Sequence, residues 1–101
     1  MYLLTMFDFP SKTKKDRRIY RRFRKSLLEL GYTRIQFSVY IKPVENATQA
    51  TTVKKCVIKA LPKQGNIRIL LLPANVYEKM ETYNNNKKHE NELPTPDFFV
   101  F

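Results

Sequence analysis

The strongest constraint on the fold is the order of apolar segments along the chain. Three short runs of apolar or β-branched residues, at 2–9, 34–41 and 67–73, are separated by two longer segments with helical periodicity. Runs of this length are typical of strands, and each intervening helix has one apolar face to bury. The order therefore predicts an α+β domain in which both helices cover the same face of an antiparallel sheet.

Residues 13–31 predict the first helix, whose two faces differ in chemistry. Thr13 and Asp16 form a capping-box pattern, and Gly31 supplies a stop. The apolar face consists of Ile19, Tyr20, Phe23, Leu27 and Leu30. The opposite arc is basic and consists of Lys14, Lys15, Arg17, Arg18, Arg21, Arg22, Arg24 and Lys25. Leu28 also falls in that arc, where we expect it to be exposed.

The middle of the chain predicts a half-buried strand and a second helix. Residues 34–41 alternate, with one row expected to be buried (Ile35, Phe37, Val39, Ile41) and the other to face solvent (Arg34, Gln36, Ser38, Tyr40). Two short strands joined by a bend fit this segment as well. Residues 46–61 predict a helix with Ala50, Val53, Val57 and Leu61 inward, and Cys56 is expected to be a small buried thiol.

These segments predict a ferredoxin-like βαββαβ sandwich over residues 1–80, with a helical turn near 77–80. A polar linker is expected at 81–96, followed by a terminal strand at 97–101. That strand contains Phe98, Phe99, Val100 and Phe101, which would promote aggregation if left bare. We therefore expect it to pack either on the chain's own sheet or on that of a symmetric partner, as a dimer contact.

The net charge of the chain indicates which kind of partner it binds. The chain of 101 residues has 19 Lys and Arg against 9 Asp and Glu, a net charge of +10, which favours a polyanion such as nucleic acid. A single cysteine cannot form an internal disulfide or a cysteine-rich zinc site, and His89 lies among polar residues and is given no role. Neither a secretory signal nor a membrane-length apolar run is found, so we expect a cytoplasmic protein with no membrane contact.

Asp8 is the candidate catalytic and metal-binding residue. It ends the first apolar run, just before Pro10 and the basic helix. A carboxylate at a strand end can bind Mg²⁺, and a twofold axis would supply a second one. The alternative is structural, because an aspartate near a proline often accepts backbone N–H bonds in a turn.

Several motifs together resemble one family. They are LLTMFDFP at residues 3–10, YRRFRK at 20–25, LLELG at 27–31, QFSVY at 36–40 and GNI at 65–67. In this order and spacing, over about residues 2–80, they are similar to the Cas-two family, the small dimeric CRISPR-associated subunit of spacer acquisition. The first and fourth motifs look most like members from type II systems.

The resemblance implies a ferredoxin-like homodimer that bridges two dimers of the CRISPR integrase subunit, Cas-one, and holds a short DNA duplex for insertion. It also implies the alternative of a Mg²⁺-dependent endonuclease acting on RNA or DNA, in which Asp8 and its symmetry mate hold the metal. Lys12 stands where some relatives carry a further acidic residue. The architectural function is preferred here, and a ferredoxin-like RNA-binding or toxin-type nuclease module is a third alternative.

Overall fold

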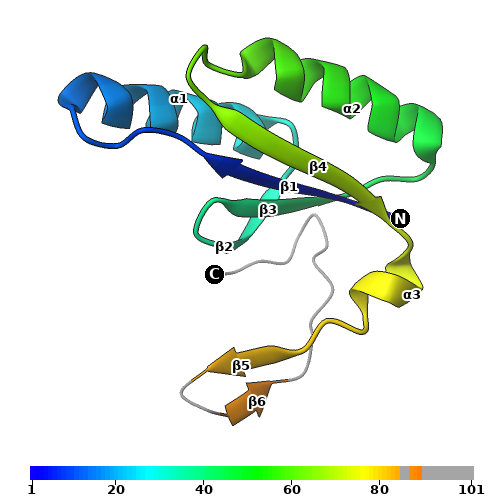
Figure 1. Ribbon diagram of the computed structural model, residues 1–101. Helices are drawn as coiled ribbons and strands as arrows, with labels where there is room; N and C mark the ends of the chain where they lie inside the picture. The colour runs from blue at the N-terminus through cyan, green and yellow to red at the C-terminus, as the bar shows by residue number, and fades with distance from the viewer. Residues whose placement is uncertain (85–86, 90–101) are drawn as a thin grey trace.

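A computed structural model, which describes residues 1–84 and 87–89, confirms the α+β fold with a four-stranded antiparallel sheet (Figure 1). The strands are β1 (Tyr2–Asp8), β2 (Thr33–Gln36), β3 (Val39–Pro43) and β4 (Asn66–Leu72). Their spatial order is β2-β3-β1-β4, and every neighbouring pair is antiparallel. Both long helices, α1 (Lys14–Glu29) and α2 (Ala47–Ala60), lie on one face, as a ferredoxin-like sandwich requires.

The ends of α1 match the signals in the sequence. The Thr13 side chain accepts a hydrogen bond from the Asp16 N–H, and the Asp16 carboxylate accepts one from the Thr13 N–H. At the other end Gly31 has a φ of 95°, and the N–H groups of Gly31 and Tyr32 donate to the carbonyls of Leu28 and Leu27. This is a Schellman arrangement, which needs a residue that tolerates positive φ.

Helix α2 is likewise bounded by local chemistry. Asn46 caps its first turn by accepting a hydrogen bond from the Gln49 N–H. Leu61 already has an extended backbone because Pro62 follows it. Ala50, Val53 and Val57 are buried, as predicted. Cys56 is exposed, so the prediction of a buried thiol was wrong: it precedes Val57 by one residue and is turned about 100° away from the buried stripe.

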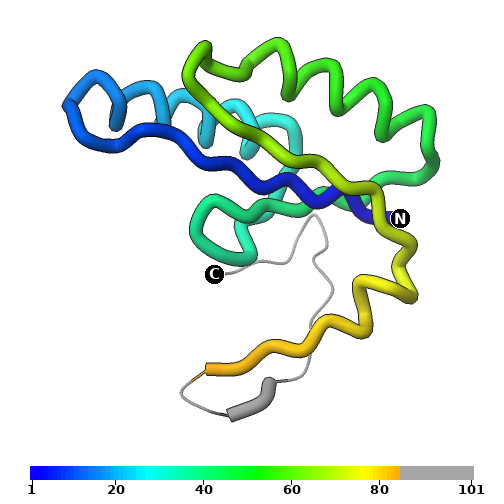
Figure 2. The backbone as a smooth tube through the Cα atoms, viewed as in Figure 1, coloured from blue at the N-terminus to red at the C-terminus, as the bar shows by residue number. Residues whose placement is uncertain are grey.

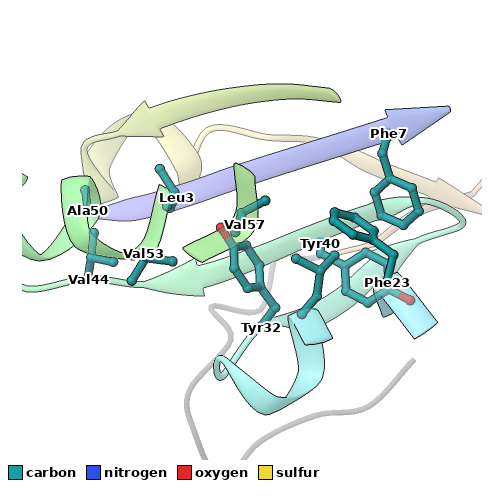
Figure 3. Packing of buried hydrophobic residues seen from close by; sticks show 10 residues of the cluster. Leu3, Phe7, Phe23, Tyr32, Tyr40, Val44, Ala50, Val53 and Val57 are labelled. Carbon is teal, nitrogen blue, oxygen red and sulfur yellow. The ribbon is translucent and has the colours of Figure 1, made fainter. Parts of the chain in front are cut away.

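The main core lies between the helices and the sheet (Figure 3). Phe7 from β1 packs edge-on against Phe23 from α1, with ring centroids 5.0 Å apart, and is stacked on Tyr40 from β3 at 5.6 Å. Among the described residues the buried polar group Thr5 is satisfied, because its hydroxyl donates to the Tyr32 hydroxyl at 2.9 Å. The aromatic cluster thus fixes α1 to the end of β1 that carries Asp8.

A second apolar cluster occupies the sheet face that the long helices leave uncovered. It contains Tyr2, Leu4, Ile41 and Tyr77, with Met6, Ile35 and Val39 partly buried beside it. Tyr77 belongs to the short helix α3 (Ala74–Tyr77), and its ring lies 4.8 Å from that of Tyr2. The helical turn predicted at 77–80 therefore exists but begins three residues earlier.

The segment 34–41 forms two strands and a turn, which confirms the bent alternative and corrects two side-chain assignments. Phe37 and Ser38 form the turn, with a φ of 59° at Ser38, and the register of β2 against β3 shifts between Arg34 and Gln36. Phe37, predicted to be buried, is 69% exposed, whereas Tyr40, predicted to face solvent, is fully buried. Ile35, Val39 and Ile41 still share one face of the sheet, as predicted. Tyr40 is buried because its own face is covered by the helices, and Phe37 is exposed because it lies in the turn.

Beyond α3 the chain forms a two-stranded hairpin, β5 (Thr82–Asn84) and β6 (Lys87–His89), within the segment expected to be a polar linker. The tube in Figure 2 shows the chain running from β4 through α3 to β5 on the side of the sheet opposite the long helices. The predicted terminal strand at 97–101, with Phe98, Phe99, Val100 and Phe101, lies outside the described residues. In the described part of the chain, no helix is both long and apolar enough to cross a bilayer.

Candidate nucleic-acid interface

The most prominent charged surface is the basic face of α1, the eight residues predicted from the sequence. All eight are exposed: Lys14, Lys15, Arg17, Arg18, Arg21, Arg22, Arg24 and Lys25. The buried residues Phe23 and Leu27 hold the opposite side of the same helix against the sheet. Positive charge is therefore displayed on a rigid scaffold. Leu28 is 43% exposed beside this face, as expected.

Arg24 differs from the other members of the basic face because it also contacts the core. Its Nε donates to the Tyr40 hydroxyl at 3.0 Å. Burial raises the pKa of Tyr40, and the hydrogen bond and positive charge of Arg24 act in the opposite direction. The guanidinium of Arg24 is thus fixed at the helix–sheet junction by this hydrogen bond.

Asp8 lies at the end of β1, paired in register with Asn66 of β4. Its carboxylate is exposed and lines an open hollow of about 360 Å³ between β1, α1 and the β2–β3 turn. The remaining lining residues, which with Asp8 define what we term the Asp8 hollow, are Phe9, Ser11, Arg17, Tyr20, Arg21, Phe37 and Ser38. Arg17 and Arg21 together outweigh the single negative charge, so the hollow suits an anionic ligand.

The described residues of one chain do not by themselves form a Mg²⁺ site. Within residues 1–84 and 87–89, no three Asp, Glu, His or Cys side chains gather closely enough to hold a metal ion. Among the described residues that line the Asp8 hollow, Asp8 is the only acidic one and Arg17 and Arg21 are cations. Mg²⁺ prefers several oxygen ligands and is repelled by nearby cations. A divalent site at Asp8 would therefore need oxygen ligands beyond those that the described residues of one chain supply, such as the Asp8 carboxylate of a second copy.

Alternation along β1 places Asp8 in a different row from the core residues. Leu3 and Phe7 belong to the cluster beneath the helices, whereas Tyr2, Leu4 and Met6 belong to the uncovered face. Asp8 continues the second row, at the edge of the apolar surface. A copy packed on the uncovered face would approach Asp8 from that side.

The exposed aromatic Phe37 was missed as a functional candidate by the sequence analysis. Its ring is stacked on Tyr20, with centroids 5.7 Å apart and planes 13° apart. The guanidinium carbon of Arg34 lies 5.7 Å from the Phe37 centroid. Neither Phe37 nor Ser38 is a residue type that marks a positive-φ turn, so the sequence carried no local signal for this exposure.

Comparisons with known proteins agree on one family. The sequence profile described as "CRISPR associated protein Cas2" matches residues 1–80. A Campylobacter jejuni protein named "CRISPR-associated endoribonuclease Cas2" is 40% identical over 81 residues, which are 80% of this chain and 57% of that protein. A Parvibaculum lavamentivorans protein of the same name is 36% identical over 88 residues, 87% of each chain.

The fold gives the same result. The crystal structure of Streptococcus pyogenes Cas2 at pH 6.5 superimposes with a TM-score of 0.66 and 25% sequence identity, over 83% of this chain and all of that one. The match to type II systems in particular stays a prediction. Profile, relatives and fold together show that the chain belongs to the CRISPR-associated Cas2 family.

Proposed function

We propose that this chain is an architectural subunit of CRISPR spacer acquisition, which dimerises, binds duplex DNA and bridges dimers of the integrase subunit Cas-one. The observation that carries the proposal is the basic face of α1, in which eight exposed cations lie on one rigid helix. Like charges at helical spacing destabilise the helix that carries them unless an anion neutralises them. A polyphosphate backbone would do so.

The arrangement favours contacts with phosphates over contacts with bases. The arginines are spread along the length of α1, and its basic face is opposed by a buried one. Such a row can follow a DNA backbone without reading its sequence. Binding should therefore be indifferent to sequence and should weaken steeply as the salt concentration rises, because the release of counterions from DNA is then less favourable.

A charge-matched pair of variants tests the binding surface. The first replaces Arg17, Arg18, Arg21 and Arg22 by Gln. The control replaces Lys54, Lys55, Lys59 and Lys63 by Gln, on α2 and the loop after it, and so removes the same net charge. We expect only the first to abolish duplex binding in an anisotropy titration. Its salt dependence should lose about one unit of slope for each phosphate contact removed. If both variants lose the same amount of duplex affinity, net charge alone explains the binding and the proposal is overturned.

Dimerisation through the uncovered sheet face is the second part of the proposal. On that face Leu4 and Ile41 are already buried and Met6 and Val39 are partly buried, while Leu70 on β4 is 51% exposed and offers apolar surface to a partner. A copy packed there would cover this surface and bring the two Asp8 rows together. The predicted exchange of the terminal strand 97–101 is compatible with this arrangement, since β4 is an edge strand of the described sheet.

Bridging is tested by assembly with the integrase subunit of the same locus. The proposal expects a complex in which one dimer of this chain joins two integrase dimers, measured by light scattering with and without duplex DNA. Asp8→Ala should assemble as the wild type does. Absence of any complex would favour the alternative of an RNA-binding or toxin-type nuclease module.

The second candidate function is a Mg²⁺-dependent endonuclease using Asp8 from both protomers. It is favoured by the exposed Asp8 carboxylate between β1 and the basic helix, and by the endoribonuclease names of the relatives. The test is cleavage of labelled single-stranded RNA and duplex DNA, with and without Mg²⁺. Asp8→Asn should abolish cleavage, whereas the control Glu45→Gln, at an exposed carboxylate in the loop before α2, should not. Cleavage that survives Asp8→Asn would reject this function.

A further inference from the structure

We propose that Phe37 is a stacking platform for an unpaired nucleobase, which gives this chain a site for single-stranded nucleic acid beside the duplex-binding helix. The inference rests on the proposed binding of nucleic acid by α1 and names a further feature of the ligand. It begins from an anomaly: Phe37 is 69% exposed, while Phe7, Phe23 and Tyr40 of the same region are buried.

The exposed Phe37 ring is held in place by the side chain of Tyr20. Tyr20 is stacked on Phe37, and the Tyr20 hydroxyl is 3.3 Å from the Ser38 Oγ, within hydrogen-bonding distance. Tyr20 in turn contacts the Phe7 ring, with centroids 5.6 Å apart. The aromatic series Phe7–Tyr20–Phe37 therefore extends from the core to the surface. A ring that is already fixed loses little conformational entropy when a ligand stacks on it.

The charges around the ring match a nucleotide. Arg17 and Arg21 line the same hollow as Phe37, and Arg34 lies against the ring. A base stacked on Phe37 would bring its flanking phosphates toward these arginines, and an arginine can also stack on a base. An apolar protein segment would gain nothing from the three cations, so the surroundings favour nucleic acid over a protein partner.

The site selects for unpaired bases. Inside a duplex each base has both faces covered by its neighbours, so only a terminal, frayed or single-stranded base can offer a face to Phe37. Duplex affinity should come from the basic face of α1, and additional affinity for single strands from Phe37. The two contributions can be separated by mutation.

Two variants at position 37 test the proposal. Phe37→Leu keeps an apolar side chain but removes the ring, and Phe37→Trp keeps a ring. The chain has no other tryptophan, so the new indole is a unique fluorescent reporter. Ile58→Ala, at a 58% exposed position on α2, is the control for loss of exposed apolar surface. The probes are an oligothymidine of about ten nucleotides, the same oligomer with abasic sugars, and a blunt duplex.

We expect Phe37→Leu to bind oligothymidine about tenfold more weakly, with duplex affinity nearly unchanged. Phe37→Trp should retain binding and be quenched by oligothymidine but not by the abasic oligomer. Equal oligothymidine affinity of wild type and Phe37→Leu, or equal quenching by both oligomers, would overturn the inference while leaving the proposed function intact. Arg17→Gln/Arg21→Gln is expected to lose binding of both oligothymidine and the duplex, whereas a wild type that binds neither oligothymidine nor the duplex would overturn both proposals.

Discussion

At the scale of single residues, the hydroxyl pair of Thr5 and Tyr32 is a polar contact inside the apolar core. Thr5 is fully buried on the central strand β1 and donates to the Tyr32 oxygen at 2.9 Å. Tyr32→Phe would leave the Thr5 hydroxyl buried without this acceptor, and an unsatisfied buried polar group costs about 1–3 kcal/mol. We expect a lower free energy of unfolding by that amount, measured by urea denaturation.

The double variant Thr5→Val/Tyr32→Phe tests whether the unsatisfied Thr5 hydroxyl causes the loss of stability. It removes both hydroxyls and leaves no polar atom unpaired, so it should be more stable than Tyr32→Phe alone. A double variant whose loss equals the sum of the two single losses would show that the two hydroxyls do not interact.

The buried tyrosines also make stability depend on pH in the alkaline range. Burial raises the pKa of Tyr32 and of Tyr40 above the usual value of about 10. Above that value the unfolded chain loses phenolic protons that the folded chain retains, so the free energy of unfolding decreases as pH rises toward the folded-state pKa values. Their stabilising contribution is fully present below about pH 10. Urea midpoints at about pH 8 and about pH 11 should show this decrease, and Tyr32→Phe should make it smaller.

At the scale of elements, the cap of α1 controls the helix that carries the basic face. Thr13→Ala removes the acceptor for the Asp16 N–H and should lower the free energy of unfolding by about 1 kcal/mol. The control is Thr51→Ala in the interior of α2, where alanine has the higher helix propensity. Thermal unfolding of the two variants measures the difference. A Thr13→Ala variant as stable as Thr51→Ala would exclude a contribution of the cap.

Helix α1 could be predicted from the sequence more accurately than the segment from β2 to β3. Helix α1 follows from signals within a few residues of its own ends, at Thr13, Asp16 and Gly31, and these were read correctly. Ile35, Val39 and Ile41 share one face of the sheet, as the alternation predicts, and Tyr40 lies on the other face. That second face is covered by the helices and does not meet solvent, and Phe37 lies in the turn at Ser38. Neither the cover of a strand's second face nor the position of the turn follows from alternation alone.

Part of the candidate site could also be predicted from the sequence, and part of it could not. The exposed basic residues of α1 follow from helical periodicity alone, and Asp8 stands out as a carboxylate ending an apolar strand. Their meeting with Phe37 in one hollow does not follow from periodicity, because β1, α1 and the β2–β3 turn come together only through the tertiary fold. Hairpin β5–β6 was missed because its residues are polar and lack the apolar alternation of a half-buried strand.

At the scale of the whole molecule, the two faces of the sheet are closed in different ways. One is covered by α1 and α2, whereas the other is covered in part by α3 through Tyr77 (Figure 1). Across the second face Leu70, Leu4 and Ile41 are directly opposite one another on β4, β1 and β3. Leu4 and Ile41 are already buried, so the apolar surface that a partner could still cover in this row is that of Leu70, which is 51% exposed.

Leu70→Lys tests whether a second copy supplies that cover. Leu70 is 51% exposed, so the monomer should tolerate lysine, but an unpaired charge within a dimer interface is strongly unfavourable. We expect self-association to weaken about a hundredfold or more in sedimentation equilibrium, with the thermal unfolding of the monomer little changed. The matched control is Ile58→Lys, which introduces the same charge at a 58% exposed position on α2. If both variants keep the wild-type dimer mass, the uncovered face is not the dimer interface. The nuclease alternative requires two Asp8 carboxylates to approach one another, and it would then lose the structural argument for that approach.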